Sequence, residues 1–238
     1  KNSEISISNT RTPVPGVFSG DHYAYVIGYS DGLVHPEANI TRAEVATIFF
    51  RLLDDATREQ YMTKENSFAD VEKGMWFNTA VSTMAAMGIV NGYPDGNFHP
   101  NANITRAEFA AIAARFDSSG NTTGVSFSDI YGHWAQKEIN LAYNNGWILG
   151  YEDGTFKPNQ NIIRAEAMTL INRVLQRVPE HEDDLLDNMT TWPDNMDTNK
   201  WYYLAVQEAT NSHDYGRKKN GYEYWTVLKE VRDWSELE

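Results

Sequence analysis

The stretch Tyr93-Pro-Asp-Gly-Asn-Phe-His-Pro100, followed by Ile104-Thr-Arg-Ala-Glu108, decides the fold because the chain contains three near-copies of it. The other turns are Tyr29-Ser-Asp-Gly-Leu-Val-His-Pro36 and Tyr151-Glu-Asp-Gly-Thr-Phe-Lys-Pro158, which lead into Ile40-Thr-Arg-Ala-Glu44 and Ile162-Ile-Arg-Ala-Glu166. The tyrosines that open the three turns are 64 and then 58 residues apart. Such a period indicates one supersecondary unit used repeatedly, which is more typical of a binding scaffold than of a single catalytic pocket.

Each Arg-Ala-Glu copy predicts the start of a helix. Thr41 with Glu44, and Thr105 with Glu108, form capping boxes, in which the hydroxyl accepts from a backbone N–H and the carboxylate reaches back to the cap. Apolar residues follow at helical spacing in all three copies, so we expect three helices to share one core. These stripes are Val45, Ile48, Phe49 and Leu52; Phe109, Ile112, Ala113 and Phe116; and Ala167, Leu170, Ile171 and Val174.

A second helix is expected upstream of each turn, where a tripeptide ending in Asp, a tryptophan and a glycine follow one another. Two complete sets are Phe68-Ala-Asp70 with Trp76 and Gly88, and Phe127-Ser-Asp129 with Trp134 and Gly146. A glycine in that position is typical of a helix C-terminus. The first repeat lacks this helix, but Trp192-Pro-Asp194 and Trp201 supply it near the other end of the chain. We therefore predict that a helix near residues 199–212 packs beside residues 22–53 and closes a three-fold ring.

The combined pattern resembles the S-layer homology (SLH) domain family of bacterial surface proteins over roughly residues 22–212. The resemblance implies a mainly α fold, a pseudo-three-fold trimer of helix-loop-helix modules around a central helical bundle with short strand-like turns. The expected division is a linker at 1–19, a split module at 20–55 plus 192–215, modules at 66–117 and 125–178, and a C-terminal extension at 216–238. Trp225 and Trp234 suggest that this extension docks on the body.

The resemblance also implies a function, the non-covalent anchoring of a larger protein to a bacterial cell wall of the Gram-positive type. The implied ligand is a secondary cell wall polysaccharide, linked to peptidoglycan and often pyruvylated, that binds in grooves between neighbouring modules. The implied location is extracellular, in the S-layer at the cell surface, with the chain as a monomeric module of a longer protein. The alternative is a structural module for self-assembly or scaffolding without a dedicated glycan site.

The sequence departs from the family pattern in four places. Ile163 replaces the cap threonine of the third motif, Val34 replaces the phenylalanine of the first turn, Trp192 replaces the phenylalanine of the last Phe-x-Asp, and His213 stands where a helix-ending glycine is expected. The loss of a threonine cap costs about 1 kcal/mol. Ile163 also removes a hydroxyl that could touch sugar, so the third groove is the one that the sequence puts in doubt.

Arg42, Arg106 and Arg164 are the principal candidates for carbohydrate binding. Each falls at the first position of its helix, where the helix dipole disfavours a cation, so the repetition suggests an anionic partner. A guanidinium fork suits a carboxylate, and a helix N-terminus offers further N–H donors. The alternative is a structural ion pair with a nearby aspartate. The motif glutamates are assigned to capping.

Three further sets of residues are binding candidates with a structural alternative each. The turn aspartates either serve the turn alone or also bind sugar hydroxyls. The aspartates of the tripeptides either cap the tryptophan helix or form groove walls. The tryptophans either stack on sugar rings or pack in the core around the three-fold axis. The sets are Asp31, Asp95 and Asp153; Asp70, Asp129 and Asp194; and Trp76, Trp134 and Trp201.

The composition excludes several classes of function. The net charge of −13 in 238 residues argues against nucleic-acid binding, which needs a basic face. The chain has no cysteine, and no apolar run reaches the length of a membrane span, so we expect neither thiolate metal sites nor membrane insertion. The six histidines show no converging ligand set, and we expect no metal and no cofactor. Three equivalent half-sites also argue against an enzyme, which needs one asymmetric centre.

Overall fold

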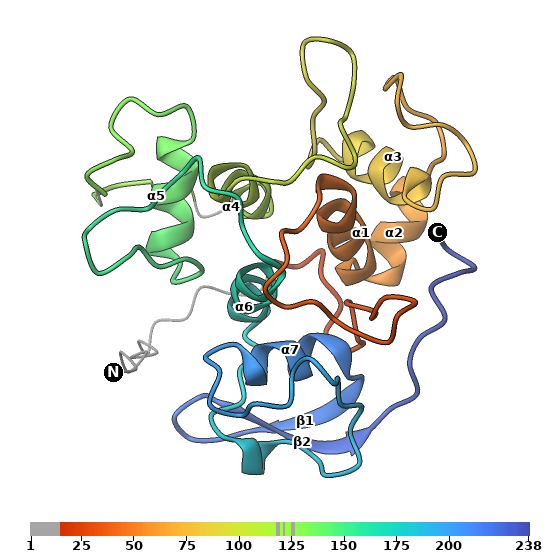
Figure 1. Ribbon diagram of the computed structural model, residues 1–238. Helices are drawn as coiled ribbons and strands as arrows, with labels where there is room; N and C mark the ends of the chain where they lie inside the picture. The colour runs from red at the N-terminus through yellow and green to blue at the C-terminus, as the bar shows by residue number, and fades with distance from the viewer. Residues whose placement is uncertain (1–14, 118–119, 121, 125–126) are drawn as a thin grey trace.

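The computed structural model describes residues 15–117, 120, 122–124 and 127–238. The fold is mainly helical, which confirms the prediction (Figure 1). The helices are α1 (Arg42–Leu52), α2 (Asp55–Tyr61), α3 (Asn78–Ala86), α4 (Arg106–Ala114), α5 (Gln136–Asn144), α6 (Arg164–Leu175), the short 3-10 helix η1 (Glu182–Asp184) and α7 (Tyr203–Thr210). Strands β1 (His213–Arg217) and β2 (Glu223–Leu228) pair in an antiparallel hairpin. No helix within the described ranges is both long and apolar enough to cross a bilayer.

Helices α1, α4 and α6 begin at the three Arg-Ala-Glu copies. The capping box is complete in α1, where Thr41 Oγ1 accepts from Glu44 N at 3.3 Å and Glu44 Oε2 accepts from Thr41 N at 2.8 Å. In α6, Ile163 offers no acceptor, and only the bond from its own N–H to Glu166 Oε2 remains, at 3.0 Å. Helix α6 still runs for 12 residues. Tertiary packing of its apolar face therefore outweighs the missing cap.

A closed ring of backbone hydrogen bonds joins the three repeats at the isoleucine before each cap. Ile104 N donates to Ile40 O at 3.1 Å, Ile162 N donates to Ile104 O at 3.0 Å, and Ile40 N donates to Ile162 O at 3.3 Å. All three isoleucine side chains are buried in the core. Each repeat thus donates to one neighbour and accepts from the other, and α1, α4 and α6 lie together at the centre (Figure 1).

Each outer helix packs on the central helix that precedes it along the chain, so α3 contacts α1, α5 contacts α4 and α7 contacts α6. The segment after α7 returns to the start of the chain. Tyr25 N and Val26 N both donate to Ala209 O at 3.0 Å, and His213 N donates to His22 O at 2.9 Å. Residues 22–26 and 209–213 therefore lie side by side, although they are far apart in the sequence.

The C-terminal extension docks on the body, as its tryptophans suggested. Trp225 and Trp234 are buried, and Trp234 Nε1 donates to Ala24 O at 3.2 Å. Of the expected linker, residues 1–14 lie outside the described residues, as do residues 125–126 at the start of the last complete module. Phe18, within the same linker, is buried and pairs with Leu53 at the end of α1.

Candidate functional site

Three equivalent grooves lie where one repeat meets the next. Each is lined by the motif arginine of one repeat, the turn tyrosine and capping glutamate of its neighbour, a second arginine and one exposed tryptophan. Groove A has Arg42, Tyr93, Glu108, Arg115 and Trp134; groove B has Arg106, Tyr151, Glu166, Arg173 and Trp201; groove C has Arg164, Tyr29, Glu44, Arg51 and Trp76. Their volumes of 260, 190 and 380 Å³ lie near or below the lower end of the range of small-molecule sites, about 300–1,000 Å³.

The motif arginines reach from their helix into the turn of the neighbouring repeat. Arg42 donates from Nε to Phe98 O at 2.8 Å, from Nη2 to Asn91 O at 2.9 Å and from Nη1 to Glu108 Oε1 at 3.2 Å. Its guanidinium also lies 4.7 Å from the centre of the Tyr93 ring. The equivalent ion pairs are Arg106 to Glu166 at 2.9 Å and Arg164 to Glu44 at 3.1 Å.

The three ion pairs form a cyclic set that links each repeat to its neighbour. The structural alternative for these arginines is therefore observed, but the partner is a capping glutamate and not an aspartate. Arg42 is only 7% exposed and Arg164 only 4%, and each guanidinium already donates to a backbone carbonyl and to a glutamate. Because both still line a groove, contact with a ligand stays a prediction.

The capping glutamates have a second role that the sequence did not reveal. In Glu108, Oε2 accepts from Thr105 N at 2.9 Å, while Oε1 accepts from Arg42 and from the Tyr93 hydroxyl, the latter at 2.5 Å. In the first repeat, burial and a hydrogen bond to Glu44 raise the pKa of Tyr29 to about 12. These tyrosines therefore remain protonated donors at neutral pH.

A second arginine in each groove was missed in the sequence, although Arg51, Arg115 and Arg173 each stand nine residues after a motif arginine. In groove C, Arg51 is paired with Glu238 of the C-terminal extension, at 2.5 and 3.0 Å. In groove A, Arg115 Nη1 donates to Ile89 O at 2.5 Å. Burial lowers the pKa of Arg173 in groove B, and the described part of the chain offers its guanidinium no hydrogen bond or ion pair.

The predicted tryptophans do not pack in the core. Trp76 is 54% exposed, Trp134 62% and Trp201 58%, and each forms one wall of a groove. The core alternative is therefore wrong. Stacking on a sugar ring is geometrically open to all three indoles and stays a prediction.

The tripeptide aspartates hold the turns and do not cap the tryptophan helices, so the capping alternative is wrong. Asp70 accepts from Phe98 N and His99 N, both at 2.8 Å, and His99 has a left-handed backbone with φ of 57°. Asp129 and Asp194 bind their turns in the same way. None of the three lines grooves A, B or C.

The turn aspartates are also engaged locally, since each accepts from the backbone N–H two residues on. The pairs are Asp31 with Leu33, Asp95 with Asn97 and Asp153 with Thr155, at 2.9 to 3.0 Å. They too lie outside the lining of grooves A to C, so sugar contact by either set of aspartates stays a prediction that the groove geometry does not support.

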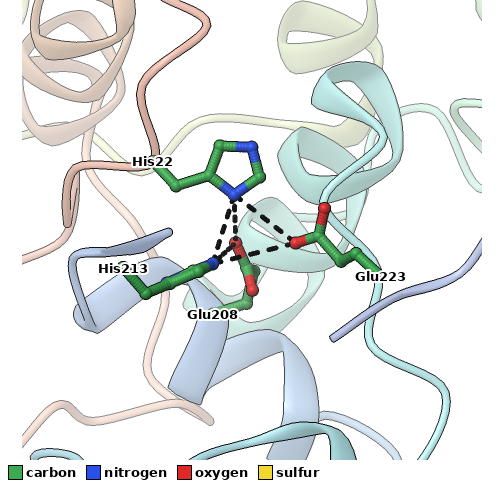
Figure 2. Close-up of side chains that lie close together, drawn as sticks. All are labelled: His22, Glu208, His213 and Glu223. Carbon is green, nitrogen blue, oxygen red and sulfur yellow. Dashed lines mark hydrogen bonds and ion pairs between the residues drawn. The ribbon is translucent and has the colours of Figure 1, made fainter. Parts of the chain in front are cut away.

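One group of residues was missed entirely. His22, Glu208, His213 and Glu223 converge in the interior (Figure 2), so the expectation that no histidine has converging partners is wrong. Burial lowers the pKa of His22 and of His213, which keeps both imidazoles neutral. Burial, followed by the charge of Glu223, raises the pKa of Glu208 to about 7. No local spacing connects the four residues, so sequence patterns offered no signal.

Comparison with known proteins identifies the same three repeated segments. The S-layer homology domain family matches residues 23–46, 67–110 and 126–168. Cell surface glycoprotein 1 of Acetivibrio thermocellus is 39% identical over 220 residues, covering 87% of this chain and 9% of that protein. The cellulosome-anchoring protein of the same organism is 36% identical over 211 residues (86% and 46% covered), and the S-layer protein of Bacillus licheniformis is 29% identical over 170 residues (69% and 19% covered).

The chain spans less than half the length of each of these relatives. All three family matches contain an Asp-Gly turn and the first turn of a central helix, which are the parts that build the grooves. The matched segments, the relatives and the repeated geometry together show that this chain belongs to the S-layer homology domain family, as a tandem-repeat module of the bacterial cell surface.

Proposed function

We propose that this chain is a non-catalytic anchoring module that binds an anionic secondary cell wall polysaccharide in its inter-repeat grooves. The names of its relatives refer to anchoring and to surface layers, which supports the coarse role. The finer assignment is supported by the grooves, each of which combines guanidinium groups with an exposed indole. Indole faces stack on sugar rings, and guanidinium forks bind carboxylates such as those of a pyruvyl group.

Groove B carries the proposal, because among the described residues its Arg173 has no ion-pair partner and, unlike Arg115 of groove A, no hydrogen-bond acceptor. Groove B is lined by two arginines and one glutamate, so its lining has an excess of positive charge. Groove C has the same lining, but Glu238 of the extension neutralises Arg51. An acidic polymer is repelled by a protein with net charge −13 except where cations outnumber carboxylates. Groove B therefore offers the best site for an acidic sugar.

The geometry of groove B gives its arginines and its tryptophan different roles in binding. Arg106 is held by Glu166 and by Phe156 O, at 2.9 Å in both cases, so it is a fixed, preorganised positive edge. Arg173 has no hydrogen bond or ion pair with the described residues, so its guanidinium can form a fork with a carboxylate. Trp201 supplies the apolar wall for the sugar ring.

The test is retention of the whole chain on purified cell walls, measured as a dissociation constant. A hydrogen bond to a charged group contributes about 1.5–3 kcal/mol, so Arg173→Gln should weaken binding by about 10-fold to 100-fold. Lys73→Gln is the matched control, since it removes one positive charge from an exposed ion pair far from groove B in the sequence and outside its lining. Equal binding by both variants contradicts the assignment of groove B.

Extraction of the polysaccharide from the walls should abolish retention of the unchanged chain. Retention that survives extraction contradicts polysaccharide binding as such. Sedimentation velocity over a range of concentrations separates anchoring from the alternative of self-assembly, and we expect a monomer at every concentration.

A further inference from the structure

Four buried side chains from separate segments bring four potential metal ligands together (Figure 2). His22 lies at the start of the first repeat, Glu208 lies on α7, His213 begins β1 and Glu223 begins β2. One ligand atom of each lies within 4.8 Å of all the others. The four residues are between 0% and 4% exposed.

The distances match the edges of a tetrahedron around one ion. Ligands at about 2.0–2.1 Å from a tetrahedral Zn²⁺ are about 3.3–3.4 Å apart. His22 Nδ1 lies 3.2 Å from His213 Nε2, 3.7 Å from Glu208 Oε1 and 3.5 Å from Glu223 Oε1. His213 Nε2 lies 3.4 Å from Glu208 Oε1 and 3.8 Å from Glu223 Oε1. These five edges bracket the expected value.

The orientation of the ligands is fixed by a second layer of contacts. His213 Nδ1 lies 3.1 Å from Asn211 O, which places the proton on Nδ1 and leaves the lone pair of Nε2 facing the cluster. Glu208 Oε2 accepts from Trp225 Nε1 at 2.8 Å, which turns Oε1 into the cluster. Bonds of this kind set the tautomer and direction of metal ligands in known sites.

An independent observation indicates that this cluster binds a cation. Glu208 Oε1 is buried and has no hydrogen-bond partner among the residues that the structure describes, although it faces both imidazoles. A buried carboxylate oxygen without a partner is costly, and coordination to a metal removes that cost. Arg177, Arg217 and Lys229 are cations nearby, but each is engaged elsewhere. Arg177 donates to Asp21 O at 2.8 Å, Arg217 lies 3.8 Å from the other oxygen of Glu223, and Lys229 is paired with Asp21.

We propose that His22, Glu208, His213 and Glu223 form a structural site for one zinc-type divalent ion. Two imidazole nitrogens with two carboxylate oxygens suit Zn²⁺ better than Mg²⁺ or Ca²⁺, which prefer oxygen ligands alone. All four positions are filled by protein, so the site is closed and has no position for a substrate. The ion ties the start of the first repeat to α7 and the hairpin, and so joins segments 191 residues apart.

The same site accounts for one departure from the repeat pattern. His213 stands where α3 and α5 are followed by Gly88 and Gly146, which have positive φ. Here Asn211 is extended instead, with φ of −123°, and the chain runs from α7 directly into β1. The histidine therefore replaces a glycine that ends the helix in the other repeats, and supplies a metal ligand in its place.

The experiment uses the whole chain, freed of metal by a chelator and then supplied with Zn²⁺ or Co²⁺. We expect one equivalent of zinc per chain by elemental analysis, a rise in Tm on zinc addition, and reversal of that rise by chelation. Cobalt should give the intense visible absorption of a tetrahedral complex. A chain that takes up no stoichiometric metal and whose Tm does not change overturns the proposal without any variant.

Two histidine variants locate the site. His22→Gln should lose the bound zinc, the cobalt spectrum and the zinc-dependent rise in Tm. His181→Gln is the matched control, because the His181 side chain is 70% exposed and outside the cluster, and it should behave like the unchanged chain. Equal zinc binding by both variants overturns the proposal, and circular dichroism of the metal-free proteins checks that both are folded.

Discussion

Removal of the Glu108 carboxylate tests whether the cyclic ion pairs hold the repeats together. Its oxygens accept from Thr105 N, Arg42 Nη1 and the Tyr93 hydroxyl. The Arg42 and Glu108 side chains are 8% and 19% exposed, so solvent screens this pair far less than a surface pair. Breaking a buried ion pair costs about 3–5 kcal/mol when the remaining charge has no other partner.

Arg42 keeps two carbonyl acceptors and the face of Tyr93, which places the cost of Glu108→Ala at the lower end. We therefore expect a loss of about 3 kcal/mol in the free energy of unfolding. For a chain of this size, 1 kcal/mol lowers Tm by about 2–4 °C, so the expected fall is about 6–12 °C.

The assay is urea denaturation and calorimetry of Glu108→Ala beside a control, Glu65→Ala. The control breaks the ion pair between Lys73 and Glu65, whose side chains are 67% and 76% exposed, respectively. It should change the free energy of unfolding by less than about 0.5 kcal/mol. A double-mutant cycle with Arg42→Ala should give a coupling energy of about 1–3 kcal/mol. A loss no larger than that of the control, or additivity in the cycle, refutes the idea that these pairs stabilise the junction.

Two further predictions follow from local geometry. Gly150→Ala should cost about 1–3 kcal/mol in urea denaturation, since the new Cβ meets the Phe127 ring at 2.1 Å, whereas Gly16→Ala meets nothing within 4 Å and should be neutral. The hydrogen bond from the Thr57 hydroxyl lowers the pKa of Asp54 in the folded protein. This helix cap therefore stabilises the fold at pH values above the ordinary aspartate pKa, and its contribution is lost as the pH falls from there through the lowered pKa of the folded state. Asp54→Asn should therefore show a smaller fall in Tm between neutral pH and about pH 3, and an unchanged fall contradicts this role.

The sequence was sufficient where the determining contacts are local. The starts of α1 and α4 were predictable because a capping box acts across three residues. Helix capping was one of two roles considered for the aspartates of the tripeptides, and it is wrong because their real partners lie further on, such as Phe98 N, 28 residues after Asp70. The glutamate partner of Arg42 is 66 residues away, and no spacing within one repeat points to it.

The sequence could not predict which tryptophans are exposed or which distant residues come together in the fold. A tryptophan at the start of an amphipathic helix fits either a core or a groove, and only the packing of the neighbouring repeat decides that Trp134 is exposed. The cluster around His213 depends on the path of the hairpin after α7, which has no counterpart in the other repeats. The second arginine of each groove, in contrast, could have been predicted from the sequence. Arg51, Arg115 and Arg173 occupy a repeated position, nine residues after each motif arginine.

The junction between the two ends of the module also governs the order of events when the chain is synthesised. The first turn is held by Asp194, which is made 160 residues after Val34. Groove A can form from the middle of a nascent chain, but groove B waits for Trp201. Contacts of such long range slow folding, since the chain must close a large loop before they form. A product that stops before α7 cannot complete groove B, so under the proposed function it would lack this binding site.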